Sequence, residues 1–411
     1  MSLLTKLNNK LKSGNKLYWV LREWFVVSYS TLARVKDKRA PNKKTRLLFY
    51  HINSLGFAGT EKFLQVIAKY INKEKYTVFY MYPNRLEENP QTRIRLEYIN
   101  SGGAIGIPFD YTKKEEYPPY FVSGMNPDLK KIISSFNIDL MIVADSGNAN
   151  YPFSIIKNIP IILLNIFGQP NVQKNIKFHI CTSEEVAKKL RPIVPEKKIK
   201  VYPVPSEGPL FNSKDAGDSL RACLNIAEED IVFGRIGRAD DNIHDPIGIE
   251  AFKKALNTRK DIHYVIMAPP PILKKQVQLE KIPNVHFLDS SSSEADVWAF
   301  HAAIDALAHF RNDGESFGLN IAEAMLSGKP IITHKSHIWN AHLEYLDPSF
   351  SRVANKGDSD SYAKFMLEFA EKKASGELSK MGKIAKDKAE KEFMATNIIP
   401  EFEDWIDIAV K

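Results

Sequence analysis

The chain has 411 residues, 44% of them hydrophobic and 26% charged, which is enough ordinary globular sequence for two domains. Its net charge of +8 is concentrated at the start, because residues 1–46 sum to +10 and the rest of the chain is close to neutral. A nucleic-acid-binding body would need positive charge spread over a folded face, so we expect no nucleic acid partner.

Residues 1–44 predict a basic amphipathic extension. Lysines lie opposite a leucine face, and two tryptophans follow: Leu3, Leu4, Leu7 and Leu11, then Trp19 and Trp24. The stretch is too short and interrupted to span a bilayer, and it lacks the cleavage site of a signal peptide. Such a segment is typical of a membrane surface, so we expect a cytoplasmic protein that is peripheral at the membrane. A helix packed on the body, with a solvated basic face, is the alternative.

From Arg46 onward, short apolar runs alternate with helical stretches, as in parallel sheets covered on both faces. The predicted strands of the first half are 46–52, 76–82, 104–109, 138–145, 159–167, 178–182 and 198–205. Residues 206–222 are polar and rich in Gly, Ser and Asp, which predicts a link between domains. Further strands are predicted at 230–237, 262–268, 284–289, 305–310 and 330–334, and the last 50 residues are predicted to be helical.

The two series predict an α/β protein with two tandem Rossmann-like, doubly wound domains that face a cleft. We place the first domain at 45–210, the second at 211–390 and a C-terminal helix at 391–411. Ligands of such sheets bind beyond the carboxyl ends of the strands, so polar residues that follow a strand are the candidates for a site.

The stretch RNDGESFGLNIAEAMLSGKPIITH, residues 311–334, contains two acids around a glycine. Glu315 is predicted in the loop after a strand, and Glu323 about one turn inside the next helix. The backbone N–H groups of Phe317, Gly318 and Leu319 would lack intrahelical partners, and Gly318 would let a phosphate approach closely. Two acids repel a phosphate but accept hydrogen bonds from hydroxyls on either side of it, which describes a nucleotide sugar. Capping and the helix dipole explain Glu323 alone, but not Glu315.

The segment ESFGLNIAEAM, followed by SGKPII, resembles the Glu-(seven residues)-Glu signature of retaining glycosyltransferases with the GT-B fold, family 4-like, also described as glycosyl transferases group 1. The resemblance implies that Glu315 contacts the hydroxyls of the donor sugar and that Glu323 binds the ribose. It implies that the amides of Phe317, Gly318 and Leu319 meet the diphosphate. It also implies an acceptor-side first domain, a donor-binding second domain, and a C-terminal helix that crosses back to the first domain.

The segment FGRIGRADDNIH, residues 233–244, contains an arginine after a predicted strand. A guanidinium there can bind phosphate bidentately, although a solvated surface arginine is the alternative. The resemblance places Arg238 on the departing diphosphate, with a lysine five residues later. That position is Ile243 in this chain, so we expect His244, or another cation such as Lys335 or Arg311, to take its place.

Weaker candidates follow strands of the first domain. The turn with Gly56, Gly59 and Thr60 resembles the glycine-rich first loop of the family, beneath the donor diphosphate and the acceptor. Acceptor-side candidates end another strand, and a plain turn is their alternative: Asp145 and Ser146. His51 ends the first strand, and a core histidine is its alternative.

No metal site is predicted. Cys181 and Cys223 lie in or beside apolar runs, which predicts buried thiols in a reducing compartment rather than a disulfide or a zinc site. The sequence Asp358-Ser359-Asp360 looks like the metal-binding motif of another glycosyltransferase fold. It precedes a helical stretch, so we interpret it as a helix cap.

These features predict a retaining glycosyltransferase that moves a sugar from a nucleotide diphosphate sugar to a hydroxyl acceptor, without a metal or other cofactor. Because the extension would hold the protein at a membrane, the expected acceptor is a lipid-linked saccharide or a surface polysaccharide precursor. The alternative is a catalytically silent GT-B protein that acts as a binding or scaffolding partner in polysaccharide assembly, which the missing lysine favours.

Overall fold

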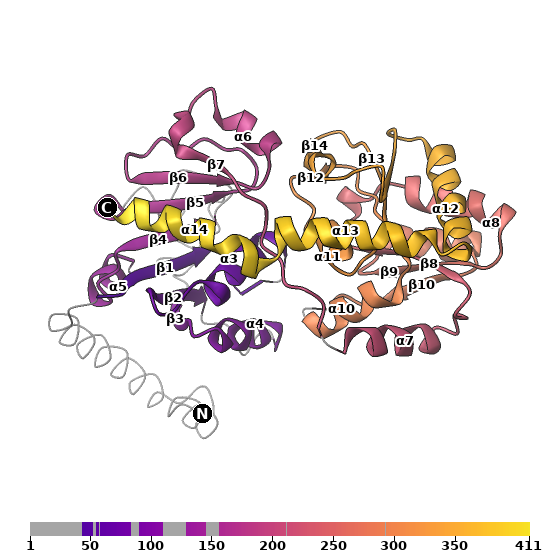
Figure 1. The fold of residues 1–411 in the computed structure, drawn as a ribbon, viewed down its shortest axis with the longest axis horizontal. Coiled ribbons are helices and arrows are strands. Elements are labelled where there is room, and N and C mark those ends of the chain that lie inside the picture. Colours follow the sequence, from indigo (N-terminus) through magenta and orange to yellow (C-terminus); the bar gives the residue numbers. More distant parts are fainter. Residues whose placement is uncertain are drawn as a thin grey trace, which may run out of the picture. The chain divides into compact units, whose positions relative to one another are not determined.

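The computed structural model describes residues 43–51, 55–56, 58–83, 90–109, 129–144, 156–210, 212–291 and 293–411 (Figure 1). Almost all of the predicted extension at 1–44 lies outside these residues. The chain divides into two compact units: Met1–Leu163 with Asn171–Phe178 and Asp404–Lys411, and Leu164–Pro170 with His179–Glu403. The domain boundaries predicted from the sequence stay predictions. In the described part of the chain, no helix is both long and apolar enough to cross a membrane.

The first sheet contains seven strands within the described residues, in the order β3-β2-β1-β4-β5-β6-β7. The elements of this part of the chain are β1 (Thr45–His51), α3 (Gly59–Tyr70), β2 (Tyr76–Pro83), α4 (Pro90–Ser101), β3 (Ile105–Phe109), α5 (Leu129–Ser135), β4 (Leu140–Ala144), β5 (Ile161–Asn165), β6 (Ile176–Cys181), α6 (Glu184–Leu190), η3 (Glu196–Lys198) and β7 (Ile199–Val201). Strand β4 is a continuous apolar run and β1 is buried from Arg46 to His51, because both faces of the sheet are covered. Leu48, Phe79 and Met141 belong to the core on one face.

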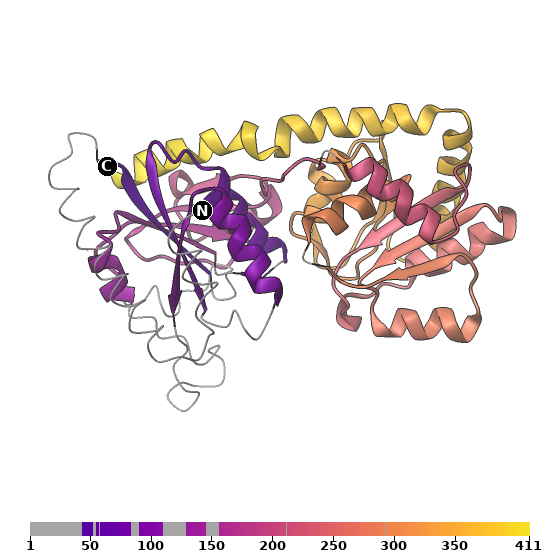
Figure 2. The same cartoon turned by 90° about the horizontal axis from the view of Figure 1, so that it is seen from below.

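The second sheet contains six parallel strands among the described residues, in the order β10-β9-β8-β11-β13-β15. The elements of this part of the chain are α7 (Ser213–Cys223), β8 (Ile231–Ile236), η4 (Asp241–Ile243), α8 (Ile247–Thr258), β9 (Ile262–Met267), α9 (Pro271–Glu280), β10 (Val285–Leu288), α10 (Glu294–Ala303), β11 (Ala306–Ala308), β12 (Gly314–Glu315), α11 (Leu319–Leu326), β13 (Ile331–His334), β14 (Trp339–Asn340), η5 (Ala341–Glu344), β15 (Ser351–Ala354), α12 (Ser359–Ala374), α13 (Glu377–Phe393) and α14 (Ala395–Val410). Strands β12 and β14 form a separate two-stranded sheet. Helix α7 packs on α10, and α8 packs on α12 (Figure 2). The predicted α/β class with two doubly wound sheets is confirmed.

The segment predicted as a link, 206–222, is the clearest error of the sequence-based interpretation, because most of it forms helix α7. Gly217 lies where α7 packs on α10, and a Cβ at this position would stand 2.6 Å from the Cβ of Ala302. The glycine therefore permits close packing instead of chain flexibility. Cys181 is buried as predicted, whereas Cys223, at the end of α7, is exposed.

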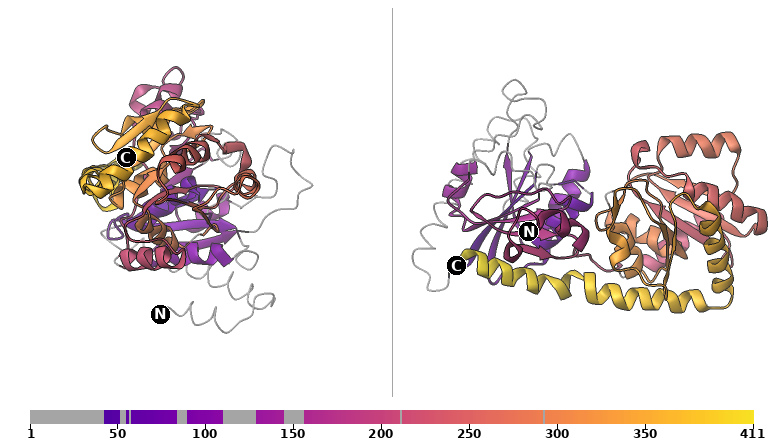
Figure 3. Two further views of the ribbon diagram at one scale, coloured as in Figure 1. Left: turned by 90° about the vertical axis from the view of Figure 1, so that its right-hand side faces the viewer. Right: turned by 90° about the horizontal axis from the view of Figure 1, so that it is seen from above.

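The helical C-terminal region is confirmed, with α12, α13 and α14 drawn in yellow (Figure 3). Asp358 caps α12, because its carboxylate accepts hydrogen bonds from the backbone N–H of Ser361 at 2.9 Å and from the Ser361 hydroxyl at 2.7 Å. The capping interpretation of this acidic motif is therefore correct. Strand β15, at the edge of the second sheet, was not predicted.

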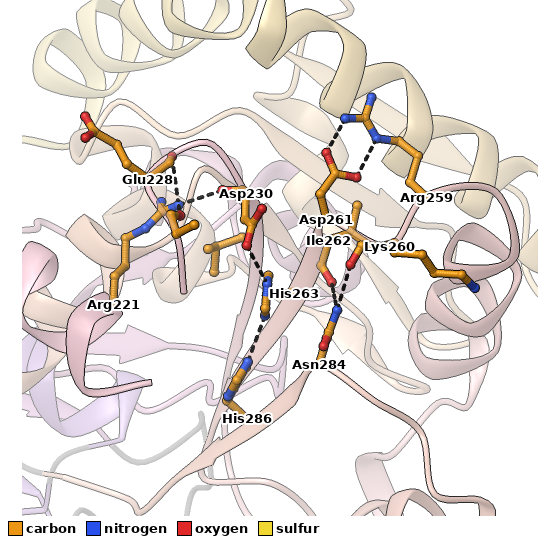
Figure 4. A network of polar contacts seen from close by, with 12 residues as sticks. Arg221, Glu228, Asp230, Arg259, Lys260, Asp261, Ile262, His263, Asn284 and His286 are labelled. Carbon is orange, nitrogen blue, oxygen red and sulfur yellow. Dashed lines mark hydrogen bonds and ion pairs between the residues drawn. The ribbon is translucent and has the colours of Figure 1, made fainter. Parts of the chain in front are cut away.

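Polar contacts fix the turns that precede three strands of the second sheet (Figure 4). Asp230, just before β8, lies 3.1 Å from Nε2 of His263, and Nδ1 of His263 lies 3.0 Å from Nε2 of His286. The side-chain amide of Asn284 donates to the carbonyls of Lys260 and Ile262. All of these groups lie at or near the amino ends of β8, β9 and β10, so they stabilise the edge opposite to the carboxyl ends of the strands.

Helix α13 packs on the end of α11 through two glycines. A Cβ on Gly382 would stand 2.0 Å from the backbone oxygen of Gly328. We expect Gly382→Ala to lower the free energy of unfolding by about 1–3 kcal/mol, because backbone atoms must move apart. Urea unfolding followed by circular dichroism measures this. Lys383→Ala, on the exposed side of the same helix, is the control, and equal unfolding midpoints for the two variants would contradict the close contact.

Candidate functional site

The carboxyl ends of β8, β11 and β13 bring several predicted residues to one edge of the second sheet. The register pairs Leu307 of β11 with Gly234 of β8, and Ala308 with Ile332 of β13. Arg238 follows β8, and the loop to Glu315 follows β11. Because β8 lies where the strand order reverses direction, this edge is the expected position of a ligand in a doubly wound sheet.

The start of helix α11 has the features of an anion site. Gly318 is its N-cap residue and has a φ of 93°, a backbone conformation that favours glycine. Among the described residues, the backbone N–H groups of Phe317, Gly318 and Leu319 find no hydrogen-bond acceptor. The Tyr345 hydroxyl holds the loop by donating to the carbonyl of Phe317 at 2.6 Å. Free N–H groups at the positive end of a helix dipole bind anions.

The chain just before Arg238 contacts this helix start. The side-chain amide of Asn320, in the first turn of α11, donates to the carbonyl of Ile236 at 2.9 Å, two residues before Arg238. Arg238 is exposed, and its guanidinium has no hydrogen bond or ion pair within the described residues. Arg235 instead lies buried against Phe310 and donates to the carbonyl of Ala268. Arg238 is therefore the arginine of this segment that a phosphate can reach.

Glu315 is held by neighbouring side chains. It lies in strand β12, which pairs with β14 so that Glu315 stands opposite Asn340; the sequence had predicted a loop here. Oε1 of Glu315 lies 3.1 Å from Nε2 of His309 and 3.5 Å from Nη1 of Arg311. Burial raises the pKa of this carboxyl, but the His309 hydrogen bond and the Arg311 charge outweigh burial and lower the pKa to about 2. Glu315 is therefore a carboxylate at neutral pH.

Glu323 lies five residues into α11 as counted from Leu319, about one turn inside the helix as predicted. Only 8% of its side chain is exposed, and Oε2 lies 3.8 Å from Nε2 of His301. The first turn of α11 contains no acidic residue, so Glu323 does not act as a capping partner of the helix start. The capping alternative for Glu323 is thereby excluded.

Ile243, five residues after Arg238, does not provide the positive charge that a lysine would add at this position. Ile243 is buried, with 5% of its surface exposed. His244 packs edge-on against Phe310, and burial, assisted by the charge of Arg235, lowers its pKa, so its neutral form is favoured. Arg311 binds Asp313 and Glu315. Lys335, which follows β13, is exposed and remains the available alternative.

The candidate site residues of the first domain belong to the compact unit that contains Met1–Leu163. His51 is buried at the end of β1, and burial lowers its pKa to about 4, so its ring is neutral. Helix α3 begins at Gly59, with Thr60 as its second residue. A Cβ on Gly56 would stand 2.9 Å from Cγ of Glu61, so Gly56 makes room for α3. Asp145 and Ser146 lie outside the described residues.

Several residues at the site were not predicted from the sequence. His309 directly follows β11 and could have been found as a polar residue after a buried strand. No pattern in the local sequence indicates the other three residues: Thr333 on β13, His342 in η5 and Tyr345 directly after η5. Only the folding of the chain brings their side chains to the segment around Glu315. Among the described residues, no group of three His, Cys, Asp or Glu side chains could hold a metal ion.

The ionisation of Glu315 predicts a pH-dependent stability. Because its folded-state pKa lies below the ordinary value of 4.5, the carboxylate stabilises the fold above pH 4.5, and this contribution is lost as the pH falls toward 2. The loss should amount to roughly 2–3 kcal/mol. Urea unfolding of the wild type and Glu315→Gln from pH 2.5 to 7 should show their difference shrinking below pH 4.5. Glu229→Gln, at an exposed site, is the control; a pH-independent difference for Glu315→Gln would refute the assignment.

Comparison with known proteins shows the fold and finds one family model that matches part of the chain. Residues 218–388 match the family model of glycosyl transferases group 1. No curated protein sequence matches the chain. The structure resembles HepE from Anabaena in complex with UDP and glucose, with a TM-score of 0.68 and 18% identity over 89% of this chain and 99% of that chain.

Two further solved structures are similar over almost their whole length. A glycosyltransferase from Rickettsia africae has a TM-score of 0.70 and 14% identity, covering 90% of this chain and 99% of that chain. Sucrose-phosphate synthase from Thermosynechococcus elongatus has a TM-score of 0.65 and 13% identity, covering 89% of this chain and 99% of that chain. The family model covers only residues 218–388, and the likeness to these solved structures shows that the chain has the GT-B fold.

Proposed function

We propose that this protein moves a sugar from a nucleotide diphosphate sugar to a hydroxyl acceptor and retains the anomeric configuration. The proposal depends on one observation, the three unpartnered N–H groups at the start of α11, whose first turn contacts the chain two residues before the exposed Arg238. Support comes from the similar structures, since HepE was crystallised with UDP-glucose and the pneumococcal transferase GtfA with UDP and GlcNAc. The proposed donor site needs no metal or other cofactor.

Each acid has a separate proposed role around the diphosphate. Glu315 accepts hydrogen bonds from hydroxyls of the donor sugar, while Glu323 accepts them from the ribose. Phe317, Gly318 and Leu319 bind the diphosphate through backbone N–H groups. A separation of charges supports this division, because the carboxylate of Glu315 is already paired with His309 and Arg311 and does not compete for Arg238.

The proposed chemistry is electrostatic. Cleavage of the glycosidic bond passes through an oxocarbenium-like transition state, and negative charge grows on the leaving diphosphate. Arg238 and the N–H groups at the start of α11 stabilise that charge where it develops. His244, as a neutral ring, contributes a hydrogen bond rather than a charge. A phosphate oxygen of the leaving group accepts the proton of the acceptor hydroxyl, so no separate base from the protein is required.

A second function stays open because of one observation. Ile243 occupies the position of the family's lysine and is buried, so that position adds no positive charge for the diphosphate. This favours a catalytically silent GT-B protein that acts as a binding or scaffolding partner in polysaccharide assembly. Both candidates place a nucleotide at the same helix start, but they differ in turnover.

Donor binding and turnover separate these candidates. We expect a matching nucleotide sugar at 100 times its Kd to stabilise the fold by about 2.7 kcal/mol in a thermal shift screen.

Glu315→Ala should abolish transfer and donor hydrolysis, and Arg238→Ala should weaken UDP binding about 10–100-fold, the size of a charge-assisted hydrogen bond. Lys275→Ala, at an exposed position on α9, is the charge control. NMR of the product should show the anomeric configuration of the donor. Donor binding without hydrolysis or transfer would leave the scaffolding function in its place.

Residues 1–44 are proposed to hold the protein at an anionic membrane surface, near a lipid-linked saccharide or a surface polysaccharide precursor. Their basic, tryptophan-bearing sequence supports this role. Deletion of 1–42 should abolish sedimentation with vesicles that contain anionic lipid and should leave the hydrolysis of free donor unchanged. Neutral vesicles are the control. Equal sedimentation of the full chain and the deletion variant would exclude the role.

A further inference from the structure

The two oxygens of Glu315 have different surroundings. Oε1 is close to both His309 and Arg311, while Oε2 has no hydrogen bond or ion pair within the described residues. Arg311 is also bound by Asp313, at 2.8 Å from Nη2. The 3.1 Å contact with His309 is shorter than the 3.5 Å contact with Arg311. His309 is therefore the main hydrogen-bond donor to this carboxylate.

The hydrogen bonds of His309 assign its tautomer. A carboxylate can only accept, so Nε2 of His309 carries the proton that points to Glu315. Nδ1 of His309 lies 3.1 Å from Oγ1 of Thr333. Thr333 is fully buried on β13, and its hydroxyl can donate only one hydrogen bond. If the His309 ring is neutral, the hydroxyl proton of Thr333 points to Nδ1 of His309.

His342 completes the chain. Its Nε2 lies 3.4 Å from Oγ1 of Thr333, and its Nδ1 is buried without a hydrogen-bond partner in the described residues. If Thr333 donates to His309, then Nε2 of His342 carries the proton that points to Thr333. Burial lowers the pKa of His342 to about 3, so the ring has a single N–H group.

We propose that His342, Thr333 and His309 form a one-directional hydrogen-bond chain that positions Glu315, holding Oε1 in place and leaving Oε2 to accept from a hydroxyl of the donor sugar. The inference rests on the proposed function, in which Glu315 contacts that sugar. None of the three residues touches the sugar in this arrangement, so all are positioning residues. The backbone supports the geometry, because Tyr362 donates to the carbonyl of His309 at 2.9 Å.

The charged and titratable groups around Glu315 come from several elements. Arg311 and Asp313 lie in its own loop, Arg235 on β8, His334 on β13, His342 on η5 and Tyr345 directly after η5. Arg311 supplies the positive charge of the pair. A His309 ring that accepts from Thr333 and donates to Glu315 adds direction without adding a second charge, and the carboxylate keeps its capacity to accept a further hydrogen bond.

Thr333→Val tests the chain, because valine keeps the shape of threonine and removes both hydrogen bonds. In ¹⁵N-histidine-labelled wild type, NMR at pH 7 should show His309 as a neutral ring protonated at Nε2, with assignment by comparison with His309→Gln. In Thr333→Val, Nδ1 of His309 loses its donor, so this signal should shift toward a tautomer mixture or the doubly protonated ring. A wild-type His309 that is protonated at Nδ1 would overturn the proposal.

The kinetic test separates positioning from general damage. With UDP-glucose, or with the donor found by the screen, Thr333→Val should lower kcat/KM up to about tenfold, the upper scale of one hydrogen bond between neutral groups, and should add an ionisation between pH 5 and 8. The Kd of the corresponding nucleoside diphosphate should stay within twofold, because that ligand lacks the sugar. Thr333→Ser should recover most of the loss. Unchanged kcat/KM and pH profile in Thr333→Val would overturn the positioning role.

Failure of the proposed function gives a different result. If the wild type neither binds nor hydrolyses any nucleotide sugar, the proposed function fails, while the NMR measurement still decides the hydrogen-bond chain. His309→Gln gives a second readout should Thr333→Val unfold. Its amide N–H can donate to Glu315 without Thr333, so Thr333→Val in that background should change kcat/KM by less than twofold. A tenfold effect in both backgrounds would show that Thr333 acts by another route.

Discussion

Strand β11 is short and fully buried between β8 and β13, and the position of the whole candidate site depends on this parallel pairing. Parallel strands end at the same edge of a sheet, so Arg238, His309 and Thr333 come to that edge although they are far apart in the chain. Buried tyrosines complete the hydrogen bonding at this edge, since Tyr264 donates to the carbonyl of Ala308 at 2.7 Å. A change in this register would displace each of these groups.

The site keeps charges of opposite sign on separate supports. Glu315 is ionised in a partly buried place because His309 and Arg311 donate to one of its oxygens. Among the described residues, the positive groups that a ligand could meet include the exposed Arg238, the exposed Lys335 and the N–H groups at the start of α11. A phosphate bound there would meet the positive end of the helix, and a hydroxyl would meet the carboxylate. A ligand that carries both phosphate and hydroxyl groups requires positive and negative groups of the protein at separate positions.

Local patterns in the sequence predicted most of the regular structure. Buried strands such as β4 are continuous apolar runs, and the position of Glu323 inside α11 followed from a good helix-forming segment bounded by glycines. The prediction failed at α7, because its polar residues face solvent and Gly217 was interpreted as a sign of chain flexibility. The short strands β12 and β14 were also missed. Their pairing joins segments 25 residues apart, and neither strand has enough residues to show a period.

By itself, the sequence determined the fold class, the acids Glu315 and Glu323, and the glycine between them, since these depend on residue type and spacing along one short segment. Tertiary structure alone decided which groups surround Glu315. His342 and Thr333 reach it only because β13 pairs with β11 and η5 folds back beside that edge. It also decided that Arg235 is buried while Arg238 is exposed. The direction and ionisation of a side chain depend on its neighbours in space, and spacing along the chain does not specify them.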